Sequence, residues 1–467
     1  MRAPRAWRWF DELTGLSRGL GPILRHPVPP AGRSAWLYVL GSATLVAFLL
    51  QVVTGTALAT GYVTSSGDAY DSLRFISGTA VGRVVRGAHA YGASAMVILI
   101  GAHAIRVYLM GAYKYPRQVN WLSGAALLLL TLGMAFTGQL LRWDQTGYWT
   151  AVIAAEQAGR TPALGDWIGH FVLAGSTVGG ATLSRFFATH VFFIPGLVYL
   201  AVALHLYLVL HNGISEPPVL GRPVEPATYR AWYREHLERE GRPFWPEAAW
   251  RDAVFAMLVV AVVLGVAAAL GPPELGRPPD PTLIDASPRP DWYFLWYFAV
   301  LSVIPKWSED VVIVLGPLLL VVFLVALPLV AGRGERHPLA RPWAIAGVAA
   351  VVVLVWHESR VGAVAPWSPR FDARPLPADV VGATEGPIAT GARVFYDRGC
   401  LYCHLVSGRG GIRGPDLSTV GDRLSREQLL TRIYSGAANM PSYVTKLRGQ
   451  ELESLLAFLA SRQRNAP

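Results

Sequence analysis

Runs of apolar residues long enough to cross a lipid bilayer recur along this chain of 467 residues. Residues 35–59, 125–141 and 253–270 are examples. The hydrocarbon core of a bilayer is about 30 Å thick, and a helix needs about 17–25 apolar residues to cross it. Only 15% of the residues are charged, which is well below the usual share in a soluble domain. The sequence therefore predicts an all-α protein that crosses a membrane several times.

We expect seven spans and, before them, a basic arm. The first 34 residues include "RAWRWFDEL" and have no apolar core ahead of a small-residue cleavage site. We therefore interpret residues 1–34 as a cytoplasmic amphipathic arm on the membrane surface, not as a signal peptide. The predicted spans are 35–60, 88–110, 120–141, 187–211, 252–271, 311–331 and 342–358.

The distribution of basic residues predicts the orientation. Lys and Arg are concentrated in the second, fourth and sixth connections, around Lys114, residues 222–242 and residues 333–341. Such an excess marks cytoplasmic loops, so the N-terminus is predicted inside and, after seven spans, the C-terminus outside. The net charge of +10 is thereby explained by topology; the basic residues form no single stripe, and nucleic acid is not an expected partner.

A second kind of signal lies near the C-terminus, in "GCLYCHLV". Cys400, Cys403 and His404 form a Cys-x-x-Cys-His pattern, in which two thiols bond a porphyrin and the histidine ligates its iron. Half of a zinc site is the alternative, but no second cysteine pair exists. Met440, in "GAANMPSY", is the expected sixth ligand, with a packing role as its alternative. Bacteria attach c-type haem outside the membrane, which agrees with the predicted topology.

The two cysteines of this pattern are also the only two in the sequence. A cysteine-ligated iron–sulfur cluster therefore has no ligands in this chain. If the function requires such a cluster, a partner protein must supply it.

Histidines within the predicted spans occur as two matched pairs. His89 and His103 are fourteen residues apart in the second span, and His190 and His205 are fifteen apart in the fourth. Fourteen residues are close to four helical turns, so the members of a pair share a face about 21 Å apart along the axis. Two such helices could clamp two haems, one near each membrane face. The alternative is that each histidine is a satisfied intramembrane residue.

Glycines in the first and third spans repeat the spacing of fourteen residues. Gly41 and Gly55 lie in the first of these spans, and Gly124 and Gly138 in the third. A flat porphyrin against a helix requires positions without a side chain, although glycine also serves close packing of membrane helices. The shared spacing favours two haem levels.

Longer motifs identify a family resemblance. "RGAHAYGASAMVILIGAHAIRVYLMGAYKYPRQVNW", "RWDQTGYW" and "STVGGATLSRFFATH" resemble cytochrome b of the bc-type quinol:cytochrome c oxidoreductases, in its short chloroplast-type form. "PPDPT", "RPDWYFLWYF" and "RHPLARPW" resemble subunit IV of that type, and the tail resembles a class I cytochrome c. The implied domains are 35–215 (di-haem four-helix core), 216–366 (three spans with the quinol site), 367–384 (linker) and 385–467 (cytochrome c).

The resemblance assigns roles to individual residues. His89 and His190 would ligate the outer b haem, and His103 and His205 the inner one. Arg86 and Arg185 would pair with haem propionates; ordinary juxtamembrane arginines are the alternative. His211 lies near positions that contact quinone in the family, but it could equally be an interfacial histidine.

"PDWY" matches the family signature of the outer quinol-oxidation pocket, with Pro290, Asp291, Trp292 and Tyr293 as its residues. Asp291 stands where the family usually has glutamate, and its carboxylate could take a proton from quinol; Tyr293 is the second expected catalytic residue. A turn before an interfacial aromatic helix is the alternative.

Two further departures from the family are visible. Val39 replaces the cysteine that holds a third, covalent haem in the chloroplast type. Arg142 replaces the proline of the usual "PWDQ" segment, which puts the shape of that loop in doubt.

Together these signals predict the cytochrome b/c subunit of a quinol–cytochrome c reductase in a bacterial inner membrane. The resemblance implies two b haems, one haem c, a Rieske iron–sulfur partner, a further electron acceptor and a homodimeric complex. One electron of each quinol would cross through the b haems, and the other would pass through the Rieske protein to haem c. The alternatives are a haem relay subunit without quinol bifurcation and, more remotely, a non-redox membrane protein.

Overall fold

The computed structural model describes residues 5–174, 178–280, 288–364, 374–411, 414–436, 440 and 442–464. Within these ranges the regular secondary structure is almost entirely helical, with only four two-residue strands, which confirms the predicted all-α class. Residues 365–373, which include the start of the predicted linker, and residues 437–439 and 441 beside Met440 lie outside the described ranges.

Seven helical segments of the described chain are long and apolar enough to cross a membrane, as predicted. Their bounds are Ser34–Ala59, Ala80–Leu109, Gln118–Leu140, Gly180–Asn212, Ala249–Leu270, Ser308–Val330 and Pro342–Val364. The second begins eight residues before the predicted start, because Thr79 caps it by accepting a hydrogen bond from the Gly82 amide. Arg83 and Arg86 in the first turns had suggested a loop.

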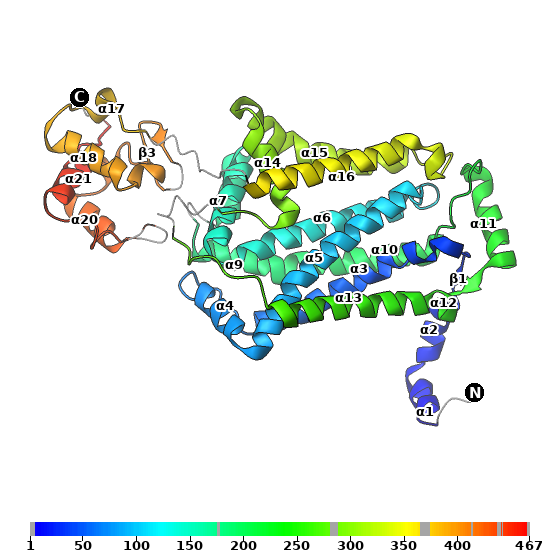
Figure 1. Ribbon diagram of the computed structural model, residues 1–467. Coiled ribbons are helices and arrows are strands. Elements are labelled where there is room, and N and C mark those ends of the chain that lie inside the picture. The colour runs from blue at the N-terminus through cyan, green and yellow to red at the C-terminus, as the bar shows by residue number, and fades with distance from the viewer. Residues whose placement is uncertain are drawn as a thin grey trace.

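Four of these helices form the core that carries the predicted histidines. They are α3 (Leu40–Ala59), α5 (Ala80–Leu109), α6 (Gln118–Leu140) and α10 (Ile194–Asn212). Helix α5 packs along α3, and α6 packs along α10. Small residues such as Ala43 and Ala47 are fully buried where the helices meet, together with Met96 and Val198. Figure 1 shows these helices running side by side through the centre of the molecule.

The fourth span contains a π-helical turn, η2 (Thr189–Phe193), between α9 (Gly180–Ala188) and α10. Pro195 follows it and has no backbone N–H to continue the regular ladder. A π turn takes up one extra residue. The extra residue therefore explains why His190 and His205 are fifteen residues apart, whereas His89 and His103 cover the same distance along a helix with fourteen.

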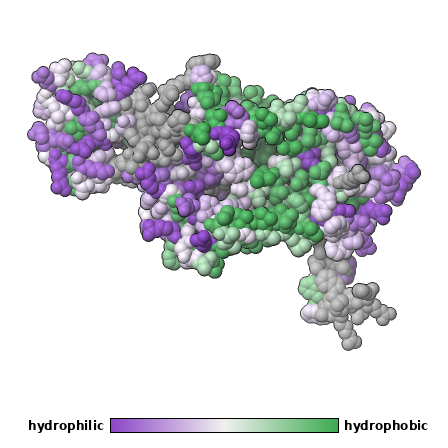
Figure 2. Space-filling view, viewed as in Figure 1, coloured by the Kyte–Doolittle hydropathy of each residue, from purple (hydrophilic) through white to green (hydrophobic). Residues whose placement is uncertain are grey.

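The remaining spans flank this core. Helix α13 (Ala249–Leu270) packs on α5 and α3, α15 (Lys306–Val330) packs on α6, and α16 (Pro342–Val364) packs on the short helix α14 (Leu295–Val303). Gly362 allows the last contact, since a Cβ there would lie 2.4 Å from the Leu295 carbonyl oxygen. Figure 2 shows apolar residues gathered over the middle of the molecule and hydrophilic residues toward its two ends. This distribution is that of an integral membrane protein.

One end of the bundle is capped by short helices α4 (Ala69–Gly78), α7 (Gln145–Gly159), α8 (Gly165–Leu173) and α9. A buried aromatic cluster that includes Trp143, Tyr148, Trp149 and Phe186 joins α7 to the core. We call this the α7 end. The N-terminal part of α5, with His89, and the C-terminal part of α6, with Gly138, lie at this end.

The opposite end carries α1 (Arg5–Thr14), α2 (Leu16–Leu24), α11 (Pro226–Glu240), α12 (Phe244–Glu247) and the short strands β1 (Pro27–Val28) and β2 (Arg242–Pro243). We call it the α11 end. The N-terminal arm contains the helices α1 and α2 and extends away from the bundle (Figure 1). Its placement on a membrane surface stays a prediction.

The chain after residue 374 folds around its own core. Its elements are α17 (Ala378–Val381), α18 (Gly386–Asp397), η5 (Cys400–Tyr402), β3 (Leu405–Val406), β4 (Arg409–Gly410), α19 (Val420–Arg423), α20 (Arg426–Ser435) and α21 (Gly449–Ala460). Phe395 and Phe458 are buried where α18 crosses α21. Gly391 permits this crossing, because a Cβ there would lie 2.0 Å from the Ser454 carbonyl oxygen. Figure 1 places this unit beyond the α7 end, opposite the N-terminus.

Candidate functional site

The structure brings the imidazole rings of His89 on α5 and His190 on η2 together, edge to face, near the α7 end. Their ring centroids are 6.3 Å apart and their planes are nearly perpendicular, at 82°. Metal–imidazole nitrogen bonds are about 2.0–2.1 Å long for zinc, so this gap matches one metal ion held between two rings. The two rings are therefore neighbours, while their role as ligands of one haem stays a prediction.

The two glycines predicted at this level lie against the imidazole rings. A Cβ on Gly55 would be 3.0 Å from His89 Cε1, and one on Gly138 would be 2.7 Å from His190 Cε1. The spacing of these glycines predicts room for a flat porphyrin. The structure adds that the histidine ring itself needs the space.

Three hydroxyl groups that were not predicted from the sequence form hydrogen bonds with the Nδ1 atoms of three of these histidines. Thr54 Oγ1 lies 3.0 Å from His89 Nδ1, Thr137 Oγ1 lies 3.0 Å from His190 Nδ1, and Ser123 Oγ lies 2.8 Å from His205 Nδ1. Each residue directly precedes one of the spaced glycines, so the Thr-Gly and Ser-Gly pairs were a readable signal.

These hydroxyls also determine which ring nitrogen is available. Each donates its own hydrogen to a main-chain carbonyl of its helix, at Leu50, Gly133 and Asn120. The hydroxyl oxygen must then accept from Nδ1–H, which leaves the Nε2 lone pair for a metal. The residues present therefore fit axial ligation of a haem iron.

The second pair lies toward the α11 end. His103 and His205 are close enough to interact electrostatically. Cβ atoms on Gly41 and Gly124 would lie 3.2 Å and 3.4 Å from their respective Cε1 atoms. Among the described residues no cluster of three or more His, Cys, Asp or Glu could hold a metal ion. The role of each pair as ligands of a haem iron stays a prediction.

Arg106 is a further residue that the sequence argument missed. It lies one turn beyond His103, with its guanidinium 3.7 Å from the Tyr38 ring centroid. Its Nε and Nη2 are buried and have no hydrogen-bond partner among the described residues. A buried, incompletely paired cation beside a histidine pair suits an acidic group such as a haem propionate.

Arg86 and Arg185, the two arginines predicted to contact propionates, have contacts with other residues of the chain. Arg86 is buried, and its guanidinium donates to Ser77 Oγ at 3.0 Å and to the Pro273 carbonyl at 2.9 Å. The guanidinium of Arg185 lies over the Phe171 ring, 4.7 Å from its centroid. Their propionate contacts stay predictions.

In the C-terminal unit, Cys400 and Cys403 lie on and just after η5, beside His404. The His404 Nδ1 lies 2.8 Å from the Pro415 carbonyl, to which it donates, so Nε2 is the available ligand. Burial lowers the pKa of His404 and keeps the imidazole neutral, the form that binds iron. Gly414 leaves room for this ring, since a Cβ there would be 2.4 Å from Cε1. Met440 packs against the core of the same unit.

The PDWY segment forms a hydrogen-bonded site at the α7 end. The Asp291 amide donates to Gln139 Oε1 at 2.9 Å, and the Tyr293 hydroxyl donates to Asp291 Oδ2 at 2.9 Å. Burial, and then the neighbouring Asp291, raise the pKa of Tyr293, so its hydroxyl stays protonated. The Asp291 side chain is 33% exposed and Trp292 is 46% exposed, so this site opens outward after Pro290.

Arg142, which replaces the family's proline, reaches this site. Its Nη2 lies 2.8 Å from Asp144 Oδ2, and its Nη1 lies 3.4 Å from Asp291 Oδ1. From the sequence, the replacement of proline by Arg142 bore only on the shape of the loop around residues 142–145. The structure shows an ion-pair network instead.

The inner quinone residue proposed from resemblance, His211, is exposed at the C-terminal end of α10 and stacks on Tyr207 at 5.9 Å. Its quinone contact stays a prediction. Asp252, which the sequence argument missed, accepts a hydrogen bond from Ser42 Oγ at 2.8 Å, one residue from Gly41. An acidic side chain within a span is uncommon and usually functional.

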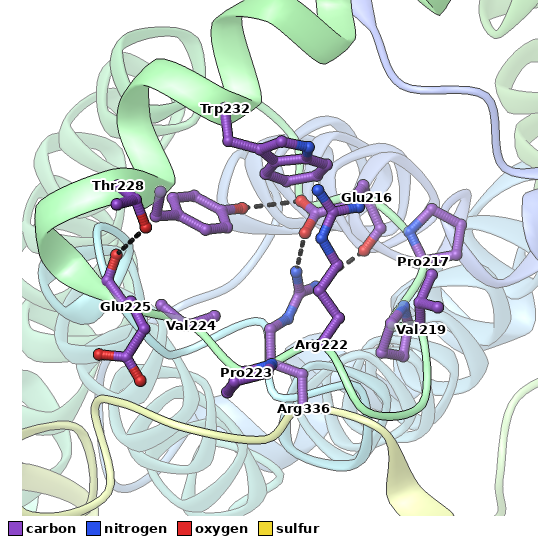
Figure 3. A pocket seen from close by; sticks show the side chains of 12 residues that line it. Glu216, Pro217, Val219, Arg222, Pro223, Val224, Glu225, Thr228, Trp232 and Arg336 are labelled. Atoms are coloured by element: carbon purple, nitrogen blue, oxygen red, sulfur yellow. Dashed lines mark hydrogen bonds and ion pairs between the residues drawn. The ribbon is translucent and has the colours of Figure 1, made fainter.

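A cavity of about 330 Å³ lies elsewhere, at the α11 end, and contains none of the predicted site residues. Figure 3 shows Glu216 in the wall of this cavity, paired with Arg336, and Glu216 also accepts a hydrogen bond from the Tyr229 hydroxyl. The Arg222 guanidinium lies 3.3 Å from the Trp232 ring centroid. These contacts join the loop after α10 to α11 and to the loop that carries Arg336, and we assign this network a structural role.

Comparisons with known proteins agree with this geometry. A family model for the N-terminal part of cytochrome b (b6/petB) matches residues 94–278, and one for the C-terminal part (b6/petD) matches residues 278–368. A model described as cbb3-type cytochrome c oxidase subunit III matches residues 386–459.

Individual relatives give the same result. Cytochrome b6 of Heliobacterium mobile is 38% identical over 211 residues, which are 45% of this chain and 99% of the relative. The menaquinol:cytochrome c reductase cytochrome b subunit of Bacillus subtilis (strain 168) is 35% identical over 221 residues, 46% of this chain and 98% of the relative. A chain of a hyperthermophilic respiratory complex III superposes with a TM-score of 0.63 and 25% identity, covering 76% of this chain and 94% of that one.

Proposed function

This chain belongs to the cytochrome b family and carries a cytochrome c domain after its last span, and from that premise we propose that it oxidises quinol at the α7 end of the bundle. It is the cytochrome b of a bc-type complex and acts as an oxidoreductase. We place the α7 end at the outer membrane face and the α11 end in the cytoplasm. The basic loops predicted to be cytoplasmic lie at the α11 end.

The observation that carries the proposal is the pair of histidine levels. The rings of His89 and His190 are neighbours, and the hydroxyls bonded to Nδ1 of His89, His190 and His205 leave Nε2 of each ring as the nitrogen free to bind a metal. His89 and His190 would hold the outer b haem, and His103 and His205 the inner one. Cys400, Cys403, His404 and Met440 would hold haem c. When bound, the b haems carry one electron of each quinol across the membrane, and haem c takes the other from an iron–sulfur partner.

The protein's own part in the reaction is binding and proton handling at Asp291. Its side chain is one-third exposed, Oδ2 accepts a hydrogen bond from the Tyr293 hydroxyl, and its amide donates to Gln139. It can accept the proton that quinol releases and turn it toward water. Trp292 presents an apolar ring beside it for the quinol, and its indole nitrogen donates to Ser94 Oγ at 3.2 Å.

The fused cytochrome c domain provides an acceptor at high effective concentration, because a tether replaces diffusion between separate proteins. The cluster that feeds it must come from a partner, and we propose a Rieske protein within a homodimeric complex of a bacterial inner membrane. A soluble or membrane-bound acceptor would then oxidise the haem c.

The haem content tests the assignment of ligands. We expect two b haems and one haem c per chain, because two histidine pairs and one Cys-x-x-Cys-His pattern are present. Acid–acetone extraction should remove the b haems and leave one covalent haem on the protein. A second covalent haem would contradict the assignment of Val39 as a position without a thioether bond.

Dependence on a partner gives a separate test. The isolated chain should not reduce cytochrome c with quinol at a useful rate, because its two cysteines belong to the haem pattern and no cluster can be held. Adding the purified Rieske protein should restore turnover. Rapid turnover by the chain alone would show that the iron–sulfur partner is not required.

A further inference from the structure

Two positions at which the sequence departs from the family, Arg142 and Asp291, contact each other. They are 149 residues apart in the chain, yet Arg142 Nη1 lies 3.4 Å from Asp291 Oδ1. The aspartate is one methylene shorter than the usual glutamate, and the arginine lies where the usual proline would offer no charge. The contact suggests that the two departures act together.

Arg142 also forms an ion pair with a second carboxylate, that of Asp144. Its Nη2 and Nε donate to Asp144 Oδ2 at 2.8 Å and 3.3 Å. Asp144 is fully buried and also accepts from the amides of Gly147 and Gly276, each at 2.9 Å. Burial alone would lower the pKa of Arg142, but the carboxylates of Asp144 and Asp291 raise it overall, so the guanidinium stays charged.

The bond to Asp291 is the weaker of the two that Arg142 makes. At 3.4 Å it is longer than the bond to Asp144, and the Asp291 side chain is one-third exposed while Asp144 is not exposed. The other ionisable groups around this site are Tyr293, which donates to Asp291, and Arg86, which interacts electrostatically with Arg142 and Asp144. If one contact opens, it is therefore the one between Arg142 and Asp291.

We propose that Arg142 is a positioning residue, which holds the Asp291 carboxylate at the pocket edge while it is charged and releases it once it is protonated. This inference rests on the proposed function, in which Asp291 accepts a proton from quinol. The quinol O–H bond breaks and an O–H bond forms on Asp291. The neutral carboxyl group then loses its attraction to Arg142, which remains on Asp144, and it can turn toward water.

The test is the pH dependence of quinol oxidation in Arg142→Gln and Arg142→Lys, assayed in the complex with its iron–sulfur partner. An opposite charge nearby favours the charged form of a carboxyl group, so removal of the Arg142 charge is expected to show in the pH dependence. Arg142→Gln, which keeps a donor for Asp144 but no charge, should move the acidic fall in kcat upward by about 1 pH unit. Arg142→Lys keeps the charge and should retain most of the original profile, with KM little changed in both.

Three controls separate the outcomes. Arg426→Leu removes a surface cation paired with Glu453 in the cytochrome c domain and should leave the profile unchanged. If Arg142→Gln does not assemble, Arg142→Met carries the same comparison, because it also removes the charge while Asp144 keeps the Gly147 and Gly276 amides as donors. An unchanged profile in a folded Gln variant, with Asp291→Asn still slow, would overturn the role of Arg142. Wild-type turnover by Asp291→Asn would instead remove the quinol site of the proposed function.

Discussion

Replacing Asp291 with asparagine is expected to slow quinol oxidation on the order of 10- to 1,000-fold, given typical contributions of a general base. Asparagine keeps the size of the side chain and can still interact with Tyr293, but it has no basic oxygen for the quinol proton. The loss should appear in kcat, measured by quinol-dependent cytochrome c reduction in the assembled complex.

Asp291→Glu is the matched control, because it restores a carboxylate and the commoner family residue. We expect it to retain most activity. Spectra of all haems and their reduction by dithionite should be unchanged in both variants, since neither touches an axial ligand. If Asp291→Asn turned over like the natural protein across the pH range, Asp291 would be a loop residue and the proton path would lie elsewhere.

The second large effect is expected at Gly138. A Cβ there would lie 2.7 Å from His190 Cε1, closer than side-chain carbons approach one another, so Gly138→Ala must displace the imidazole. The outer b haem then loses the alignment of one axial ligand. We expect the ratio of b haem to haem c to fall from two toward one, as measured by pyridine haemochrome spectra with haem c as the internal standard.

Gly133, in the same helix, provides the control for this substitution. A Cβ there would make an ordinary contact of 3.6 Å with Ile194, so Gly133→Ala should keep both b haems. The four haem-level glycines should also form a graded series, with the largest loss where the ring is nearest, in the order Gly138, Gly55, Gly41 and Gly124. A full b-haem complement in Gly138→Ala would contradict the assignment of His190 as a ligand in this position.

The sequence by itself determined the membrane architecture, because each of its signals is local. A span is a run of apolar residues, and the bilayer requires that run to be helical, so seven spans could be counted without tertiary information. Cys400, Cys403 and His404 are likewise neighbours in the chain. The spacing of His89 and His103 places both on one face of a single helix, whatever packs against it.

The tertiary structure decided the features that join distant segments. Thr54 and His89, or Arg142 and Asp291, belong to different helices or loops, and no periodicity links them. The π turn at Thr189–Phe193 is a local irregularity whose purpose appears only when His190 faces His89. That Nε and Nη2 of Arg106 are buried without a hydrogen-bond partner among the described residues can be seen only in the folded structure. The composition of a helix sets where it lies in the membrane, whereas its partners are set by which side chains interlock when the helices pack.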